Sequence, residues 1–451
     1  MKLDSEQNTF NQGLMNFLDT SPTPFHACQN LLTRLLESGY QHIREEDSWA
    51  QSVSKSVNSL TGKYVITRND SSLIAIDFSG EKLSDTGFHL VGAHTDSPCL
   101  KLKANAEIKQ QGYLQCGVEV YGGVLLNPWF DRDLSLAGRI SYRYKDGDVQ
   151  SCLIDFEKAI ATIPSLAIHL DREANEKHPI NPQNDIPPIL LQLSVSDEET
   201  LETLLSTAVL ENNHQLTEIQ NINILSHELC FYDTQKSAII GANDDFLCSA
   251  RLDNLLSCYI AAEALISSSD IQSKQSNVIV FNDHEEVGSS STSGAAGNFL
   301  TSILQRFCHL EDTNGLAEEN LYRALKKSNL ISADNAHAIH PNFQQKHDKS
   351  HGPLINQGPV IKINANQRYA SNSETVAEFK NLANQFNIPT QSFVIRTDIA
   401  CGSTIGPIIA SSTGIKTIDV GLATWAMHSI RETAGSKDIL SFHHLLTEYF
   451  A

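Results

Sequence analysis

Short apolar runs that alternate with helical patterns are the feature of this sequence that most constrains its fold. In the C-terminal half, segments with helical spacing separate most of the runs NVIVF (277–281), NLISA (329–333), VIKIN (360–364), SFVIR (392–396) and KTIDVG (416–421). An earlier run at 88–93 is almost continuously apolar, which is typical of a strand buried on both faces of a sheet. Strands that alternate with helices indicate an α/β fold with a mainly parallel sheet.

The N-terminal segment carries patterns of its own. Apolar residues at helical spacing over 11–39, interrupted by SPTPFH, predict two amphipathic helices. The runs GKYVITRND (62–70) and SSLIAIDFSG (71–80) predict a strand pair that turns at Asn69 and Asp70.

The secondary-structure pattern of the sequence changes between residues 98 and 234. Strand-like pieces alternate with turns there, and HPINPQNDIPP (178–188) is proline-rich and irregular. A chain of 451 residues is long enough for two domains. We therefore expect a β-rich unit over 98–234, inserted between two parts of one α/β domain at 1–97 and 235–451.

Composition limits the partners. The chain is 41% hydrophobic and 19% charged, which is typical of a soluble globular protein. Its formal charge is 33 − 53 = −20, so we expect neither nucleic acid nor an anionic membrane as a partner. We expect no signal peptide and no transmembrane helix. Nine cysteines without CxxC spacing predict reduced core thiols, and hence a cytoplasmic protein.

Side chains that can bind metal follow the predicted strands. In open α/β sheets, ligands bind at the carboxyl ends of the strands. Acidic and imidazole side chains stand at such ends, or at the start of the helical segment 248–269, in the order His94, Asp96, Asp253, Glu285, Glu286, Asp334 and His428. Each has an ordinary alternative, such as a hydrogen-bonded pair, a solvated surface step, a helix cap or a core histidine. Their joint placement favours a metal site instead.

The adjacent pair Glu285–Glu286 has a specific use in such a site. Two divalent ions about 3.5–4 Å apart need a bridging carboxylate and further carboxylates to offset their repulsion. Imidazole together with carboxylate favours zinc, manganese or cobalt over calcium. One glutamate can then be a ligand while its neighbour remains a general base beside a bridging water.

With these residues the sequence resembles the aspartyl aminopeptidase family of two-metal metallopeptidases, which includes the yeast vacuolar aminopeptidase. The resemblance covers nearly the whole chain and rests on GAHTDSPCLKLK, WFDRDLSLAGR, IPSLAIHLDR, ARLDNL, HEEVGS, SADNAHAIHPNF, GPVIKINANQRYA, CGSTIGP and AMHSIRE. It implies a mainly parallel-sheet metallopeptidase catalytic domain with an inserted β-rich dimerisation domain.

The resemblance also implies roles for the metal-binding residues. His94, Asp253 and Asp334 would hold one ion, and Asp253 as bridge, Glu286 and His428 would hold the other. Glu285 would be the general base, and Asp96 would orient His94. The implied cofactors are two divalent ions per subunit, zinc first, with manganese or cobalt as alternatives.

The implied substrate contacts come from other motifs. His337, Lys362 and Tyr369 match positions that line the substrate pocket, and the Lys362 ammonium would pair with an acidic substrate side chain. His169 would reach into the active site of a neighbouring subunit. The family resemblance further implies a tetrahedral homododecamer built from dimers. The segment 178–188 follows the family only loosely, which leaves the intersubunit contacts near His169 less defined.

The expected function is a metal-dependent aminopeptidase that releases an unblocked N-terminal residue, preferably Asp or Glu, from peptides. A metal-bridged water would attack the scissile carbonyl, with Glu285 as base. Two alternatives remain open at the level of sequence. One is a two-metal carboxypeptidase or deacylase, in which Lys362 would bind an α-carboxylate. The other is a non-catalytic oligomeric scaffold, which would bind little metal and hydrolyse no peptide.

Overall fold

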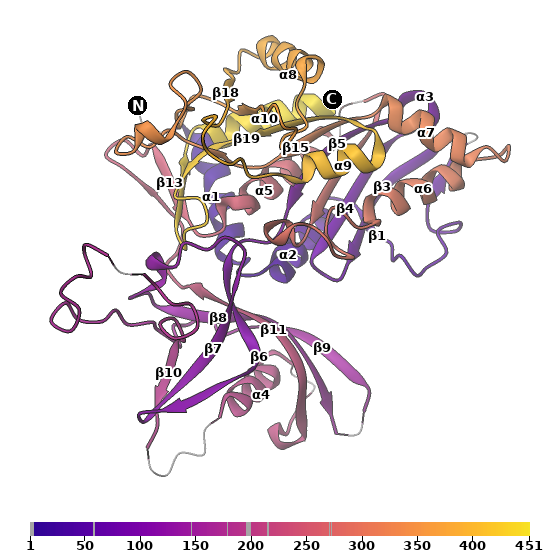
Figure 1. Cartoon of the computed structure of the whole chain (residues 1–451). Coiled ribbons are helices and arrows are strands. Elements are labelled where there is room, and N and C mark those ends of the chain that lie inside the picture. The colour runs from indigo at the N-terminus through magenta and orange to yellow at the C-terminus, as the bar shows by residue number, and fades with distance from the viewer. Residues whose placement is uncertain are drawn as a thin grey trace. The chain divides into compact units, whose positions relative to one another are not determined.

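The chain forms two compact units. The computed structural model describes residues 4–56, 59–145, 147–177, 179–194, 200–213, 216–269, 271 and 273–451 (Figure 1). The first unit comprises Met1–Asp96, Ser237–Met427 and Glu432–Ala451, and the second comprises Ser97–Lys236 and His428–Arg431. The expected role of the 98–234 segment in dimerisation remains a prediction.

The first unit is built on a sheet with the strand order β1-β3-β4-β14-β5-β15-β19-β17-β18, and β2 also pairs with β3. Its central strands run parallel to one another and are β14 (Ser276–Asn282), β5 (Phe88–His94), β15 (Asn329–Ala333) and β19 (Lys416–Gly421). Because they are parallel, their carboxyl ends meet at one edge of the sheet.

The sheet is mixed, so the α/β fold is confirmed but the expectation of a mainly parallel sheet is met only in part. Antiparallel pairs flank the parallel centre: β3 with β4, β4 with β14, and β19 with β17. The hairpin of β3 (Leu60–Arg68) and β4 (Ser72–Ser79) confirms the predicted turn, where Asn69 and Asp70 both have φ of 54°. A short hairpin needs no crossover helix, so antiparallel strands join the sheet here. The remaining strands are β1 (Gln41–His42), β2 (Ser54–Lys55), β17 (Val360–Lys362) and β18 (Gln391–Phe393).

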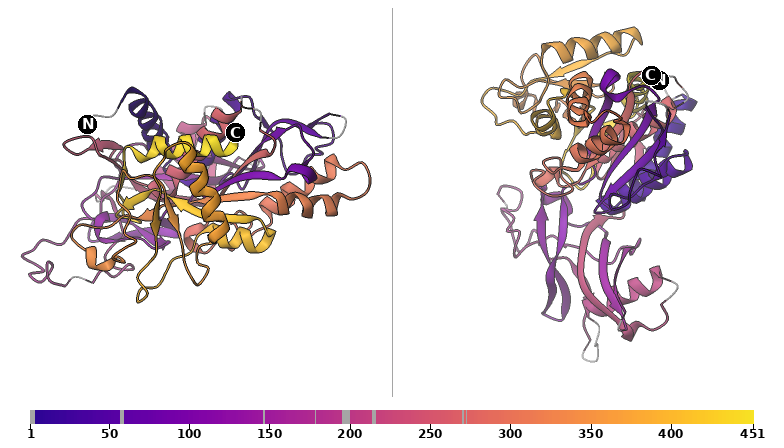
Figure 2. Two further views of the ribbon diagram at one scale, coloured as in Figure 1. Left: turned by 90° about the horizontal axis from the view of Figure 1, so that it is seen from above. Right: turned by 90° about the vertical axis from the view of Figure 1, so that its right-hand side faces the viewer.

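Helices cover both faces of this sheet (Figure 1, Figure 2). Ile279 and Phe281 of β14 pack in a core with α1 (Ser5–Asp19), α2 (Pro24–Glu37), α5 (Leu252–Ser268), α8 (Ser373–Gln385) and α10 (Asp438–Phe450). Val278 and Val280 pack in a second core with α3 (Leu83–Thr86), α6 (Phe299–Glu311), α7 (Ala317–Lys327) and α9 (Ile405–Thr413). Alternate residues of one strand thus enter opposite cores, which explains its continuous apolar run. In the described part of the chain, no helix has both the length and the apolar character needed to span a membrane.

A smaller sheet in the first unit has the order β12-β13-β21-β20-β16. Its strands are β12 (Ala238–Ile240), β13 (Phe246–Ser249), β21 (Glu432–Gly435), β20 (Ala423–Trp425) and β16 (Ala336–His337). β16 follows Asp334 by a single residue, so this sheet continues from the carboxyl edge of the main sheet.

The second unit is β-rich. Its antiparallel sheet has the order β10-β7-β6-β11-β8-β9. Its strands are β6 (Cys99–Gln110), β7 (Tyr113–Tyr121), β8 (Leu134–Tyr144), β9 (Val149–Asp155), β10 (Ile189–Gln192) and β11 (Ile222–Asp233). Helix α4 (Leu201–Asn212) packs on the sheet through Leu205 and Val209, which lie in one core with Leu136 and Leu229.

Candidate metal centre

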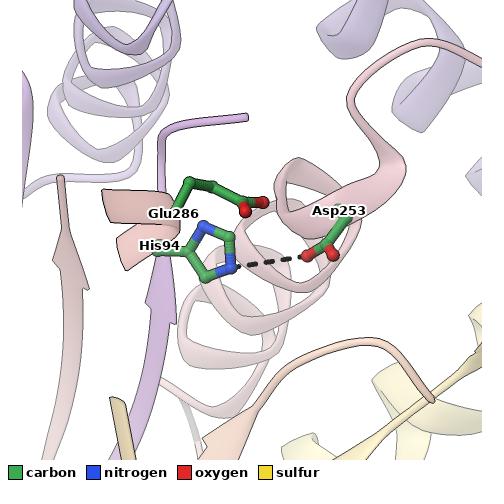
Figure 3. Close-up of side chains that lie close together, drawn as sticks. All are labelled: His94, Asp253 and Glu286. Atoms are coloured by element: carbon green, nitrogen blue, oxygen red, sulfur yellow. Dashed lines mark ion pairs between the residues drawn. The ribbon is translucent and has the colours of Figure 1, made fainter. Parts of the chain in front are cut away.

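Three ligand-type side chains converge at the carboxyl edge of the main sheet: His94, Asp253 and Glu286 (Figure 3). Each offers one ligand atom, and these atoms all lie within 4.8 Å of one another. His94 Nε2 is 3.4 Å from Asp253 Oδ1 and 3.9 Å from Asp334 Oδ1, so Asp334 borders the same centre.

Strand ends supply most of this cluster. His94 is the last residue of β5, and Asp334 directly follows β15. In the pairing of β14 with β5, Asn282 lies opposite His94. A short 3₁₀ turn, η3 (Glu285–Val287), follows and carries both glutamates. The parallel centre of the sheet therefore brings three distant segments to one edge.

Asp253 is positioned differently. It is the second residue of α5, but its φ and ψ are not helical, and its peptide bond to Asn254 is cis. The Asp253 backbone N–H donates to Glu432 Oε2 across 2.9 Å, and both side chains are buried.

Asp96 links the histidine to the two glutamates. Its Oδ1 accepts the backbone N–H of Glu285 at 3.1 Å, and its Oδ2 accepts that of Glu286, also at 3.1 Å. His94 Nδ1 is 3.0 Å from the Asp96 carbonyl oxygen and 3.4 Å from Oδ1. A partner at Nδ1 leaves Nε2, the nitrogen that faces Asp253, for a metal. These contacts are the geometry that the expected orienting role of Asp96 requires, and the role itself remains a prediction.

The centre concentrates negative charge in a buried space. Burial raises the pKa of Glu285 to about 8, His94 opposes the rise, and Asp334, Asp253 and Asp96 add to it. Burial and Asp253 likewise raise the pKa of Glu286 well above its usual range. For His94, burial lowers the pKa, but hydrogen bonds to Asp253 and Asp96 outweigh this and raise it well above its usual value. These groups take up protons because burial and the neighbouring carboxylates disfavour further negative charge.

The donor set fits a divalent metal ion. An imidazole nitrogen with carboxylate oxygens is the combination that zinc accepts, whereas calcium prefers oxygen ligands alone. A metal would supply the positive charge that the protons supply otherwise. His94, Asp253, Glu286 and Asp334 are the residues of the first unit that would hold it.

The predicted substrate residues of the first unit lie beside this centre. Lys362, the last residue of β17, is 2% exposed, and its Nζ is 3.1 Å from Asp334 Oδ2 and 3.1 Å from the Asn335 carbonyl oxygen. The ammonium also lies 5.1 Å from the centroid of the Tyr369 ring. His337 is exposed at the end of β16, with its ring 5.8 Å from that of Phe393.

The remaining two predicted residues, His428 and His169, belong to the second unit. His428 Nδ1 pairs with the Gly123 carbonyl oxygen at 3.1 Å. His169 is exposed in a turn. Their expected roles, as a ligand of the second ion and as a residue of the neighbouring active site, remain predictions.

Two residues of the centre did not emerge from the sequence. Glu432 holds the Asp253 backbone, and the Asn335 carbonyl holds Lys362. Both lie inside motifs of the family resemblance, AMHSIRE and SADNAHAIHPNF, but the ligands predicted from these motifs are His428 and Asp334. Glu432 is the first residue of β21 and directly follows Arg431, so its charge alone gave no signal of a buried role.

Comparison with known proteins identifies the class as zinc metallopeptidases. A family described as "Aminopeptidase I zinc metalloprotease (M18)" matches residues 17–450. A "Probable M18 family aminopeptidase 2" of Ectopseudomonas mendocina is 52% identical over 443 residues, covering 98% of this chain and 97% of the relative. A protein of the same description from Pseudomonas aeruginosa is 51% identical over 442 residues, covering 98% of each chain. The chain belongs to the M18 family of aminopeptidases.

Solved structures agree with this assignment. The structure titled "Cryo-EM structure of the Ape4 and Nbr1 complex" matches with a TM-score of 0.93 and 36% identity, over 100% of this chain and 87% of the other. Yeast aminopeptidase 1 matches with a TM-score of 0.84 and 27% identity, over 98% and 97% of the two chains. Family membership decides for an aminopeptidase over a carboxypeptidase or a non-catalytic scaffold.

Proposed function

We propose that this M18 aminopeptidase binds two zinc ions per subunit and removes an N-terminal Asp or Glu from peptides, with Glu285 as general base. One ion would be held by His94, Asp253 and Asp334. The other would be held by Asp253 as bridge, Glu286 and His428.

The observation that carries the proposal is the pair of hydrogen bonds between the Asp96 carboxylate and the backbone of two neighbouring glutamates. Its two carboxylate oxygens accept the backbone N–H groups of Glu285 and Glu286. Glu286 belongs to the cluster with His94 and Asp253, whereas Glu285 is not part of that cluster. This difference supports a ligand role for Glu286 and leaves Glu285 beside it for proton transfer.

The chemistry follows from this division of roles. When bound, zinc supplies Lewis-acid activation of the scissile carbonyl and of the attacking water. Glu285 accepts the proton of that water and delivers it to the leaving amine. Its high proton affinity suits the task, since burial among acids raises its pKa to about 8. Bound zinc would lower this value by adding positive charge nearby.

The acidic preference rests on Lys362. An ammonium has three N–H groups, and the structure gives this one two oxygen partners, Asp334 Oδ2 and the Asn335 carbonyl. The third N–H would bind the side-chain carboxylate of an N-terminal Asp or Glu. Such a charged hydrogen bond is strong because the site is almost fully buried. Tyr369 and His337 would line the same pocket.

Self-association is part of the proposal. A solved structure titled "Structure of S. cerevesiae mApe1 dodecamer" matches this chain with a TM-score of 0.84 and 27% identity. In the second unit, the exposed side chains next to His169 are apolar: Leu166 (56%), Ile168 (47%) and Leu170 (75%). Clustered exposed apolar side chains favour a protein contact. If a neighbouring subunit covered these side chains, His169 would reach into the active site of that neighbour. The assembly would be a tetrahedral dodecamer built from dimers.

Hydrolysis of matched chromogenic anilides tests the proposal. Asp, Glu and Leu anilides are compared with zinc-loaded protein, with chelated protein, and after zinc, manganese or cobalt is restored. N-acetyl-Asp anilide is the control for a free α-amine. Bound zinc is measured in the same samples.

We expect metal-dependent turnover that favours Asp and Glu over Leu, no hydrolysis of the acetylated substrate, and two zinc ions per chain at full activity. Preference for Leu would overturn the acidic pocket. Full activity at one zinc per chain would overturn the two-metal site.

A further inference from the structure

Asp419 is a buried carboxylate that the proposed reaction does not use. It lies within β19, is 0% exposed, and pairs in register with Ser332 of the neighbouring strand β15. Burying a carboxylate is costly unless it is well hydrogen-bonded. Thr404 Oγ1 donates to Asp419 Oδ1 at 2.6 Å, and the Ala370 backbone N–H donates to Oδ2 at 2.6 Å. Both distances are short, as in hydrogen bonds to an ionised acceptor.

The two donors come from two different loops. Ala370 directly follows Tyr369, and Thr404 ends the CGST segment before α9. The loops also contact one another, because Ser403 Oγ donates to the Arg368 carbonyl at 3.2 Å. On the loop of Ala370, the next residue completes the attachment: Ser371 Oγ accepts the Asp419 backbone N–H at 3.0 Å. A central strand therefore fastens both loops.

The same carboxylate is electrostatically linked to Lys362. Burial raises the pKa of Asp419, whereas the Lys362 ammonium and the Thr404 hydroxyl lower it. Lys362 in turn lies against the Tyr369 ring. The packing around Asp419 leaves little freedom. A Cβ at Gly406 would lie 2.5 Å from Asp419 Oδ2 and 2.6 Å from Oδ1, so only glycine fits there.

We propose that Asp419 is a positioning residue that clasps the Tyr369–Ser371 loop to the Cys401–Thr404 loop and thereby sets the shape of the pocket for the N-terminal side chain of the substrate. It touches neither the metal ligands nor the reacting atoms in this scheme. The inference rests on the proposed function, because that proposal assigns Tyr369 and Lys362 to the substrate.

The test compares four variants with wild type: Thr404→Val, Asp419→Ala, Asp419→Asn and Thr417→Val. Thr417 is the matched control, since it is a buried threonine of the same strand whose hydroxyl donates to the Ile415 carbonyl at 3.0 Å and not to Asp419. For each protein, kcat and KM are measured with Asp and Leu anilides, and bound zinc is measured per chain.

Thr404→Val should lower the ratio of kcat/KM for Asp over Leu about tenfold or more, chiefly through KM, because one charged hydrogen bond of the clasp is lost. Asp419→Ala should lower it further. Asp419→Asn should recover part of the loss, since its amide oxygen can accept the Ala370 N–H while its NH₂ donates to the Thr404 hydroxyl. Thr417→Val should keep the wild-type ratio, and zinc per chain should be equal in all five proteins.

Two results would overturn the clasp. One is a Thr404→Val ratio equal to that of Thr417→Val, and the other is zinc loss that parallels the loss of activity. The proposed function fails separately, if wild type itself does not prefer Asp. In that case the clasp still requires a raised KM for the preferred substrate in Thr404→Val and not in Thr417→Val.

Discussion

The backbone N–H of Glu285 donates to the Asp96 carboxylate across 3.1 Å, so the proposed base takes its position from a residue that also contacts His94. The second Asp96 oxygen accepts the N–H of Glu286 at the same distance. The Asp96 side chain thereby contacts the backbone of the proposed base and of one proposed ligand, Glu286, and the ring of another, His94.

Asp96→Asn should lower both activity and zinc affinity. An amide offers one oxygen, whereas two backbone N–H groups need an acceptor, and the amide NH₂ would face one of them. Partners of this kind are worth about 10–100-fold in metal affinity or activity. Zinc titration followed by kcat at saturating metal would measure the two effects. Wild-type values for both would contradict the positioning role. Asp85→Asn, which alters an exposed ion pair with Arg323, is a control for a lost surface carboxylate.

Lys362→Met should separate substrate binding from support of Asp334. If the ammonium binds the substrate carboxylate, kcat/KM for Asp falls about 10–100-fold relative to Leu, as expected for a charged hydrogen bond. If it serves only its 3.1 Å contact with Asp334, both substrates lose activity together and zinc content falls. Anilide kinetics with zinc analysis distinguish these results, and the second would remove the acidic-pocket assignment.

Leu170→Asp should weaken self-association. Leu170 is the most exposed of the apolar side chains beside His169, at 75%. A charge that becomes buried without a partner costs several kcal/mol, so the equilibrium should shift by at least about tenfold toward smaller species. Light scattering after size-exclusion chromatography measures the mass of the oligomer. Leu316→Asp is the control, because Leu316 is 55% exposed in the first unit. An unchanged mass for Leu170→Asp would place the contact elsewhere.

Glu311 should give the protein a pH-dependent stability away from the metal. Burial raises its pKa from 4.5 to about 7, although the Leu83 N–H, which donates to both carboxylate oxygens at 3.1 and 3.0 Å, lowers it. Between these values the folded protein binds a proton that the unfolded chain lacks, so this contribution to stability falls as pH rises from 4.5 to about 7.

Glu311→Gln has no such proton to lose. Its melting temperature relative to wild type should therefore rise between pH 5 and 7 and change little above about pH 8. Glu318→Gln, at the exposed start of α7, serves as the matched control. A difference independent of pH would contradict the assignment.

The local patterns predicted much of this structure. Continuous apolar runs predicted the central strands, because both faces of the sheet are covered. Asn69 and Asp70 predicted the hairpin turn, because both residues accept positive φ. Ligand-type residues at strand ends gave His94, Glu286 and Asp334, since parallel strands bring their carboxyl ends together. The pattern of alternation did not reveal that the sheet is mixed, because pairing direction is set by tertiary contacts.

Other parts of the site depend on contacts between distant residues. Asp253 looks like an ordinary helix-start carboxylate, yet its backbone is non-helical and held by Glu432, 179 positions away. Lys362 matches a substrate position, but its pairing with Asp334 arises only when β17 and β15 flank β19 in one sheet. Asp419 carries no motif at all, and its partners lie 15 and 49 positions away. Sequence spacing alone does not encode such contacts.

Turnover by zinc-loaded Glu285→Gln tests the central claim most directly. The amide keeps the size of the side chain and leaves the backbone N–H free to donate to Asp96, but it cannot accept a proton. We predict wild-type zinc content and kcat for an Asp anilide lowered about 10²–10⁴-fold, the contribution of a general base. Wild-type zinc content with near wild-type kcat would show that another group takes the proton, and would contradict the account.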